Sequence, residues 1–280
     1  MNKMKILNNL NDFNQILSEL LKNREKIGLV PTMGSIHKGH LSLLKKSKKL
    51  NYYSIVTIFV NPTQFNDLED YNNYPKNEDR DIKVLKDNKC DLLFLPNVKD
   101  IYPEKVEINK NIDDFRDILC DRFRPGHFDG VVTVVDLLFK LIKPNAVFFG
   151  EKDFQQLKII ERYIKNNNLP ILFYSCSSIR MSNGMSYSSR YNQFTNDDKK
   201  IFDKTSQLIY QHIRILNKNF NPKVIDNLVG EVSKLGIKKI DYFEVREESN
   251  LKISKNKNNS RLFVAFYINK VRVIDNFILY

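Results

Sequence analysis

Short apolar runs alternate with amphipathic stretches over the first two-thirds of the chain. The runs at 26–31, 53–60, 91–95, 146–149 and 170–174 are apolar at consecutive positions, which predicts strands buried on both faces. Between them, the stretches at 41–50, 78–88, 131–142 and 154–166 carry apolar residues at helical spacing. This alternation predicts an α/β fold, a doubly wound parallel sheet whose ligands bind at the carboxyl ends of the strands.

The pattern changes after about residue 179. Two helical stretches at 197–216 and 222–235 precede strand-like runs at 240–246, 261–268 and 271–279. Asn269-Lys270, between the last two runs, is short enough to turn a hairpin. We therefore expect two domains, a doubly wound one over residues 1–179 and a smaller α+β one over residues 180–280.

Composition narrows the class of protein. The formal charge of +12 comes from lysines scattered among asparagines, without a basic face interleaved with aromatic residues, so we expect neither a nucleic-acid partner nor a membrane surface. No apolar run reaches the length of a membrane helix, and residues 1–10 lack the apolar core of a signal peptide. The three cysteines form no CxxC pair, which favours a reducing compartment, the cytoplasm.

The first candidate site follows the first predicted strand, at Pro31-Thr32-Met33-Gly34-Ser35-Ile36-His37-Lys38-Gly39-His40. Two glycines allow a tight turn and close backbone approach, and a helix beginning near His37 would offer free N–H groups to an anion. His37 and His40 are three residues apart and share one face of a helical turn. This pattern favours a triphosphate site and is typical of class I adenylate-forming and nucleotidyl-transferring domains.

Three further segments carry candidate chemistry. Gly150-Glu151-Lys152-Asp153-Phe154-Gln155-Gln156 follows a predicted strand, so it is expected at the same sheet edge as the histidines, with Lys152 available to a phosphate. Ser188-Ser189-Arg190 provides hydroxyls and a guanidinium for phosphate binding. Asn61-Pro62-Thr63-Gln64 presents neutral amides after another strand, suited to a hydroxyl or carboxylate.

In this order, these segments resemble the pantothenate synthetases, or pantoate–β-alanine ligases. The resemblance includes Arg124-Pro125-Gly126-His127-Phe128 and the C-terminal Arg272-Val273-Ile274-Asp275-Asn276, and it covers nearly the whole chain. It implies a Rossmann-like domain that binds ATP and pantoate, a smaller C-terminal lid domain and a homodimer. The implied activity, in pantothenate and coenzyme A biosynthesis, forms a pantoyl adenylate from ATP and pantoate. β-Alanine then attacks the adenylate and releases AMP.

The resemblance also assigns residues. It implies that ATP is bound by Met33, Gly34, Ser35, Ile36, His37, Lys38, Gly39, His40, Gly150, Glu151, Lys152, Asp153, Ile179, Tyr187, Ser188, Ser189 and Arg190. Among these, His40, His37, Lys152 and Arg190 are the catalytic candidates, acting by positioning and charge stabilisation. The candidates for pantoate and β-alanine are Gln64, Gln156, Asn61 and Arg124. A magnesium ion is expected to accompany the triphosphate, with Asp81 as its candidate ligand.

The sequence departs from the family pattern at three places, one of which is Arg80, which interrupts an acidic pair in the 78–81 segment. Cys120 stands where the family usually has a glutamate, and Tyr191 follows Ser-Ser-Arg where it usually has an asparagine. A nucleotidyltransferase or a truncated aminoacyl-tRNA synthetase shares the histidine motif, but the former lacks the 61–64 and 124–128 segments. The latter needs tRNA-binding modules for which 280 residues leave little room. A noncatalytic RNA-binding module is the third class, disfavoured by the scattered charge.

Overall fold

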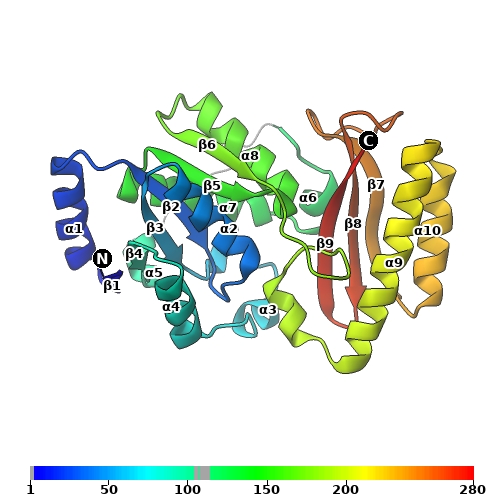
Figure 1. Ribbon diagram of the computed structural model, residues 1–280, viewed down its shortest axis with the longest axis horizontal. Helices are drawn as coiled ribbons and strands as arrows, with labels where there is room; N and C mark the ends of the chain where they lie inside the picture. Colours follow the sequence, from blue (N-terminus) through cyan, green and yellow to red (C-terminus); the bar gives the residue numbers. More distant parts are fainter. Residues whose placement is uncertain (1–2, 104–106, 108–113) are drawn as a thin grey trace. The chain divides into compact units, whose positions relative to one another are not determined.

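The computed structural model describes residues 3–103, 107 and 114–280, which form two compact units (Figure 1). The large unit comprises Met1–Arg116, Arg124–Glu151 and Gln156–Ser177, and the small unit comprises Asp117–Phe123, Lys152–Gln155 and Ser178–Tyr280. The change of unit at residue 178 lies close to the expected limit at 180. Two short segments that we expected in the first domain cluster with the small unit instead.

The large unit contains a parallel sheet in the order β1-β4-β3-β2-β5-β6. Its strands are β1 (Lys5–Leu7), β2 (Ile27–Thr32), β3 (Tyr53–Ile58), β4 (Leu92–Phe94), β5 (Ala146–Gly150) and β6 (Leu172–Cys176). Its helices are α1 (Leu10–Lys22), α2 (Lys38–Lys49), α3 (Leu68–Asn72), α4 (Glu78–Asp87), α5 (Val98–Ile101) and α7 (His127–Ile142), with the 3-10 turn η1 (Pro62–Gln64). The 3-10 turn η2 (Glu151–Asp153) and the helix α8 (Phe154–Asn166) each have residues in both units. The fold class predicted from the alternating pattern is confirmed.

Side chains of the central strands pack against helices on both faces of this sheet. Val30 and Val56 pack with Leu44 of α2 in one cluster. On the strand next to these, Phe94 instead stacks on Phe13 of α1, with ring centroids 4.0 Å apart. Both faces are covered, which is why the strands read as continuous apolar runs.

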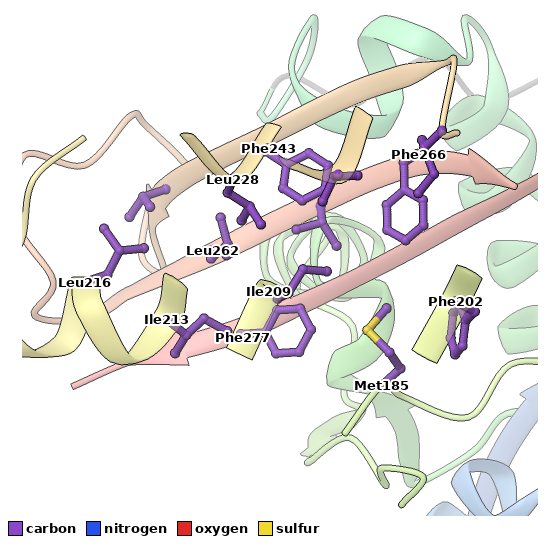
Figure 2. Close-up of a cluster of buried hydrophobic side chains, with 14 of the residues drawn as sticks. Met185, Phe202, Ile209, Ile213, Leu216, Leu228, Phe243, Leu262, Phe266 and Phe277 are labelled. Atoms are coloured by element: carbon purple, nitrogen blue, oxygen red, sulfur yellow. The ribbon is translucent and has the colours of Figure 1, made fainter. Parts of the chain in front are cut away.

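The small unit packs two long helices on an antiparallel sheet. Its elements are α6 (Leu119–Phe123), η3 (Ser189–Gln193), α9 (Asn196–Lys218), α10 (Lys223–Lys234), β7 (Ile240–Glu247), β8 (Ser260–Ile268) and β9 (Val271–Leu279), with sheet order β7-β8-β9. Figure 2 shows the core, where Ile209 and Leu216 of α9 and Leu228 of α10 face Leu262 and Phe266 of β8. The expected hairpin at Asn269-Lys270 is present, with Asn269 at φ 51°.

Among the described residues, no helix is long and apolar enough to cross a membrane.

Candidate functional site

The turn after β2 is built from residues that hold one another in an unusual backbone conformation. Gly34 has φ 83° and Ser35 has φ 51°, so two consecutive residues occupy the left-handed region. Thr32 Oγ1 donates to Thr57 O at 2.7 Å and accepts from Gly34 N at 3.1 Å. The turn therefore leaves the sheet edge in one fixed direction, toward the histidine motif.

Asp81 of α4 completes this turn. Its buried carboxylate accepts from the backbone N–H of Ser35 at 2.6 Å and of Ile36 at 2.7 Å. Burial raises the pKa of the Asp81 carboxyl, and the two backbone donors oppose that shift. Both carboxylate oxygens are thus engaged by the protein, so Asp81 holds the turn in place. Its assignment as a metal ligand stays a prediction.

His37 and His40 lie together at the start of α2, with stacked rings whose centroids are 4.0 Å apart. Nδ1 of His37 accepts from Gly39 N at 3.1 Å, and Nδ1 of His40 accepts from His37 N at 3.4 Å. The second bond is one half of a capping box, in which the His37 side chain also caps the backbone N–H of His40. An accepting Nδ1 places the proton of a neutral imidazole on Nε2. In its neutral form, each ring therefore has its N–H at Nε2, a donor suited to phosphate oxygens.

The turn after β3 is anchored through Asn61, whose side chain is buried. Asn61 Nδ2 donates to Gly130 O at 3.1 Å and to Gln64 Oε1 at 3.2 Å, and its Oδ1 accepts from the Tyr102 hydroxyl at 2.8 Å. The amide of Asn61 is fully used within the protein. It fixes the side chain of Gln64, the neutral amide that the sequence assigns to substrate.

A second set of contacts holds the backbone of Gln64. His127 Nδ1 donates to Gln64 O at 2.7 Å, because a carbonyl can only accept. The neutral ring then accepts at Nε2, where Arg124 Nη1 donates at 3.1 Å, and Arg124 Nη2 donates to the same carbonyl at 3.2 Å. The structure thus brings Asn61, Gln64 and Arg124 together within the large unit.

Gly130 of α7 allows the close approach of this turn, since a Cβ there would lie 2.3 Å from Thr63 O. Gly130→Ala is expected to destabilise the protein by about 1–3 kcal/mol and to raise the KM for pantoate, because the backbone next to Gln64 must move. Thermal unfolding and pantoate titration check this. The matched control is Gly230→Ala in α10, which meets no atom within 4 Å and should gain about 0.5–1 kcal/mol. A stable Gly130→Ala with unchanged pantoate KM would contradict the expectation.

The segment after β5 divides between the units, with Gly150 and Glu151 in the large unit and Lys152 and Asp153 in the small one. Ser175 Oγ donates to Glu151 Oε1 at 2.9 Å, which ties the segment to the neighbouring strand β6. Gln156 is half-buried at the start of α8, in the same unit as Gln64. Lys152 Nζ lies 3.5 Å from Asp153 Oδ1, and its side chain is 20% exposed.

In the small unit, the 179–190 segment folds back on itself. Tyr187 N donates to Ile179 O at 3.1 Å, and Arg180 and Ser186 form an isolated antiparallel bridge. The two predicted ATP residues Ile179 and Tyr187 are therefore paired. Ser188 then caps η3, its Oγ accepting from Arg190 N at 3.3 Å, so that Ser188, Ser189 and Arg190 lie on one turn.

Two of the departures from the family pattern, Cys120 and Tyr191, lie in the small unit. Cys120 Sγ is 3.2 Å from the Tyr242 hydroxyl and accepts from Arg272 Nη1 at 3.4 Å. The Tyr191 ring packs against Phe194 and Phe202, with centroids 5.7 and 5.5 Å away. Both side chains thus belong to the packing of the unit.

Some residues that shape the site carry no role in the sequence prediction. His127 stands inside a recognised motif, so its polar side chain was a usable signal. Tyr102 and Gly130 had no such signal, since only the folded chain places them beside Asn61. Among residues 3–103, 107 and 114–280, no group of three or more His, Cys, Asp or Glu side chains is placed to hold a metal ion.

Comparisons with known proteins match nearly the full chain. The family model described as pantoate-beta-alanine ligase matches residues 5–278. The pantothenate synthetase of Thermosipho africanus is 35% identical, over 99% of this chain and 100% of the relative. The crystal structure of pantoate-beta-alanine ligase from Francisella tularensis, complexed with beta-gamma ATP and beta-alanine, has a TM-score of 0.82 at 38% identity. This match covers 98% of the present chain and 97% of the Francisella chain.

A second solved structure, pantothenate synthetase from Thermus thermophilus, has a TM-score of 0.87 at 28% identity, over 99% of this chain and 100% of its own. Family model, relatives and structures therefore agree over both units and not only over the histidine motif. On this ground, and with the motif residues in the positions described above, the chain belongs to the pantoate–β-alanine ligase family.

Proposed function

We propose that this chain joins pantoate to β-alanine in two steps, through a pantoyl adenylate. In the first, a pantoate carboxylate oxygen attacks the α-phosphorus of ATP, and the bond from that phosphorus to the bridging oxygen breaks to release pyrophosphate. In the second, the β-alanine amine attacks the pantoyl carbonyl carbon and loses a proton, and AMP leaves. The full-length match to the ligase family carries this proposal.

The site residues have the chemistry that these steps require. Negative charge builds up around the α-phosphorus, so donors that point there lower the barrier. His37 and His40 contribute Nε2–H donors, while Lys152 and Arg190 contribute positive charge. The remaining ATP contacts proposed are those of the sequence prediction, at residues 33–40, 150–153, 179 and 187–190.

Pantoate is proposed to bind through neutral amides and a guanidinium. Gln64 and Gln156 offer amide groups without added charge, and Arg124 is positioned beside the Gln64 carbonyl. Asn61 is the fourth proposed substrate contact, and its amide also bonds to Gly130, Gln64 and Tyr102. β-Alanine is assigned to Gln64 as well.

A magnesium ion is proposed to enter with the triphosphate and to neutralise part of its charge. Magnesium keeps several waters and needs few protein ligands in such sites. Asp81, whose carboxylate oxygens accept from Ser35 N and Ile36 N, remains the proposed protein ligand. We also propose a cytoplasmic homodimer; the three buried, free cysteines agree with a reducing compartment.

Pantoate-dependent exchange of labelled pyrophosphate into ATP is expected without β-alanine, because adenylate formation is reversible before the amine arrives. The measurement is label incorporation with each substrate omitted in turn. Exchange that requires β-alanine would rule out a separate adenylate, and activity that depends on tRNA would favour the synthetase alternative.

A lid role is proposed for the small unit, centred on residues 182–192. On addition of ATP and pantoate, the amides of Ser188, Ser189 and Arg190 should exchange hydrogen more slowly, because an adenylate must be shielded from water. Ser186 N, already bonded to buried Asp275, should change little and is the internal control. Equal exchange with and without ligands at 188–190 would refute the lid.

A further inference from the structure

Two consecutive residues of β9, Asp275 and Asn276, are polar and nearly inaccessible, with 4% and 1% exposure. Neighbouring residues of a strand point to opposite faces of the sheet. Asp275 pairs with Val264, which belongs to the core under α9 and α10, so Asp275 faces the helices. Asn276 therefore faces the other side, the side of Phe263, whose ring lies 5.9 Å from Phe154.

Asp275 anchors the segment that leads to the Ser188 turn. Its Oδ2 accepts from Ser186 N at 2.7 Å and from Arg180 Nη1 at 3.2 Å. Its Oδ1 accepts from Ser186 Oγ at 2.7 Å and from Asn276 N at 2.8 Å. One buried carboxylate thus fixes both sides of the Arg180–Ser186 bridge, immediately before Tyr187.

Asn276 anchors the other phosphate-binding segment. Its Nδ2 donates to the backbone carbonyl of Lys152 at 3.0 Å, and its Oδ1 accepts from Arg261 Nη1 at 2.8 Å. The Arg261 guanidinium also lies over the Phe154 ring, 4.1 Å from its centroid. β9 thus holds the backbone at Lys152, and Arg261 of β8 contacts the side chain of nearby Phe154.

We propose that Asp275 and Asn276 are positioning residues of the ATP site, which set the spacing between Lys152 and the turn that carries Arg190. Both anchored segments belong to the small unit, so the spacing is a property of that unit alone. The inference rests on the proposed function, which gives both segments to ATP. Small displacements of charge-stabilising groups cost large factors in rate, which is the reason for two buried anchors on one strand.

The test uses substitutions that keep size and remove one function. Asp275→Asn replaces a carboxylate that accepts from four donors with an amide, whose Nδ2 cannot accept a hydrogen bond. Asn276→Asp removes the donor to the Lys152 carbonyl and keeps an acceptor for Arg261. The matched control is Asp241→Asn, because Asp241 is a buried carboxylate (3% exposed side chain) in the same sheet that pairs with Arg272 at 2.7 Å. Steady-state pyrophosphate exchange is measured well below the midpoint of unfolding of each variant.

Each of the two test variants is expected to lower kcat/KM for ATP by about tenfold or more and to leave the KM for pantoate within about twofold. Asp241→Asn should lower the unfolding temperature without that loss. Unchanged ATP parameters in folded variants, or an equal loss in Asp241→Asn, would overturn the proposal. Should Asp275→Asn fail to fold, Asn276→Asp alone decides.

The inference and the proposed function fail in different ways. Wild-type protein without pantoate-dependent exchange would refute the function. Calorimetric titration with ATP alone would still test the anchors, since weaker ATP binding in Asn276→Asp than in Asp241→Asn supports them and equal binding overturns them.

Discussion

Replacing His40 with alanine is expected to slow adenylate formation by about a hundredfold or more, on the order of 3 kcal/mol. Nδ1 of His40 is engaged by His37 N, so the neutral ring carries its proton on Nε2. A donor at Nε2 can form a hydrogen bond to the negative charge that develops on the α-phosphate oxygens. Single-turnover formation of pantoyl adenylate, measured with saturating ATP and pantoate, reports the loss directly.

Two further variants separate chemistry from helix capping. His40→Asn keeps an acceptor near the start of α2 but has no Nε2–H, so it should be about as slow as His40→Ala. His212→Ala removes a buried histidine of the small unit, bonded to Leu208 O at 2.9 Å, and should affect unfolding but not the rate. Near-normal turnover in folded His40→Ala would remove His40 from the site.

The sheet was predictable because its strands are short apolar runs buried on both faces. The five runs predicted from the pattern correspond to β2 to β6, and each end agrees to within about two residues. β1 was missed because it has only three residues, of which Lys5 and Ile6 are exposed. α1 was also missed, although Phe13, Leu17 and Leu20 recur at helical spacing and Asn9 caps it, so the signal was present.

The helix α7 shows where local pattern reasoning stops. The pattern predicted a start at Val131, whereas the helix begins at His127. The first turn contains Gly130, which argues against a helix on propensity alone. In the structure that glycine is required by the Thr63 backbone, a contact between segments far apart in sequence that no local pattern contains.

The site divides in the same way. The turns that carry the candidate residues could be predicted from motifs, because a turn after a buried strand is a local feature. The residues that hold those turns, Tyr102, Asp275 and Asn276, come from distant elements and have ordinary sequence surroundings. The internal partners of Asn61 are likewise visible only in the fold, and its assignment to substrate stays a prediction.

Replacing Lys152 with alanine should also slow adenylate formation by about a hundredfold or more, near 3 kcal/mol. Its ammonium lies 3.5 Å from Asp153 Oδ1, longer than a good charge-assisted hydrogen bond of about 2.7–2.9 Å. The weak pairing leaves the charge available to a phosphate oxygen. The anchored carbonyl of Lys152 fixes the point from which its side chain extends.

Lys158→Ala is the matched control for this variant. Lys158 lies on α8 with a 22% exposed side chain, close to the 20% of Lys152, but it pairs with Glu161 at 2.7 Å. Such surface pairs contribute about 0–1 kcal/mol to stability. Because Lys158 is not among the candidate site residues, we expect the rate of its variant to stay within about twofold of the wild type. Both variants lower the formal charge of +12 by one, and long-range attraction of ATP therefore changes equally. A difference between them isolates the local charge at the α-phosphate, whereas equal losses would assign the effect of Lys152 to net charge and remove it from the site.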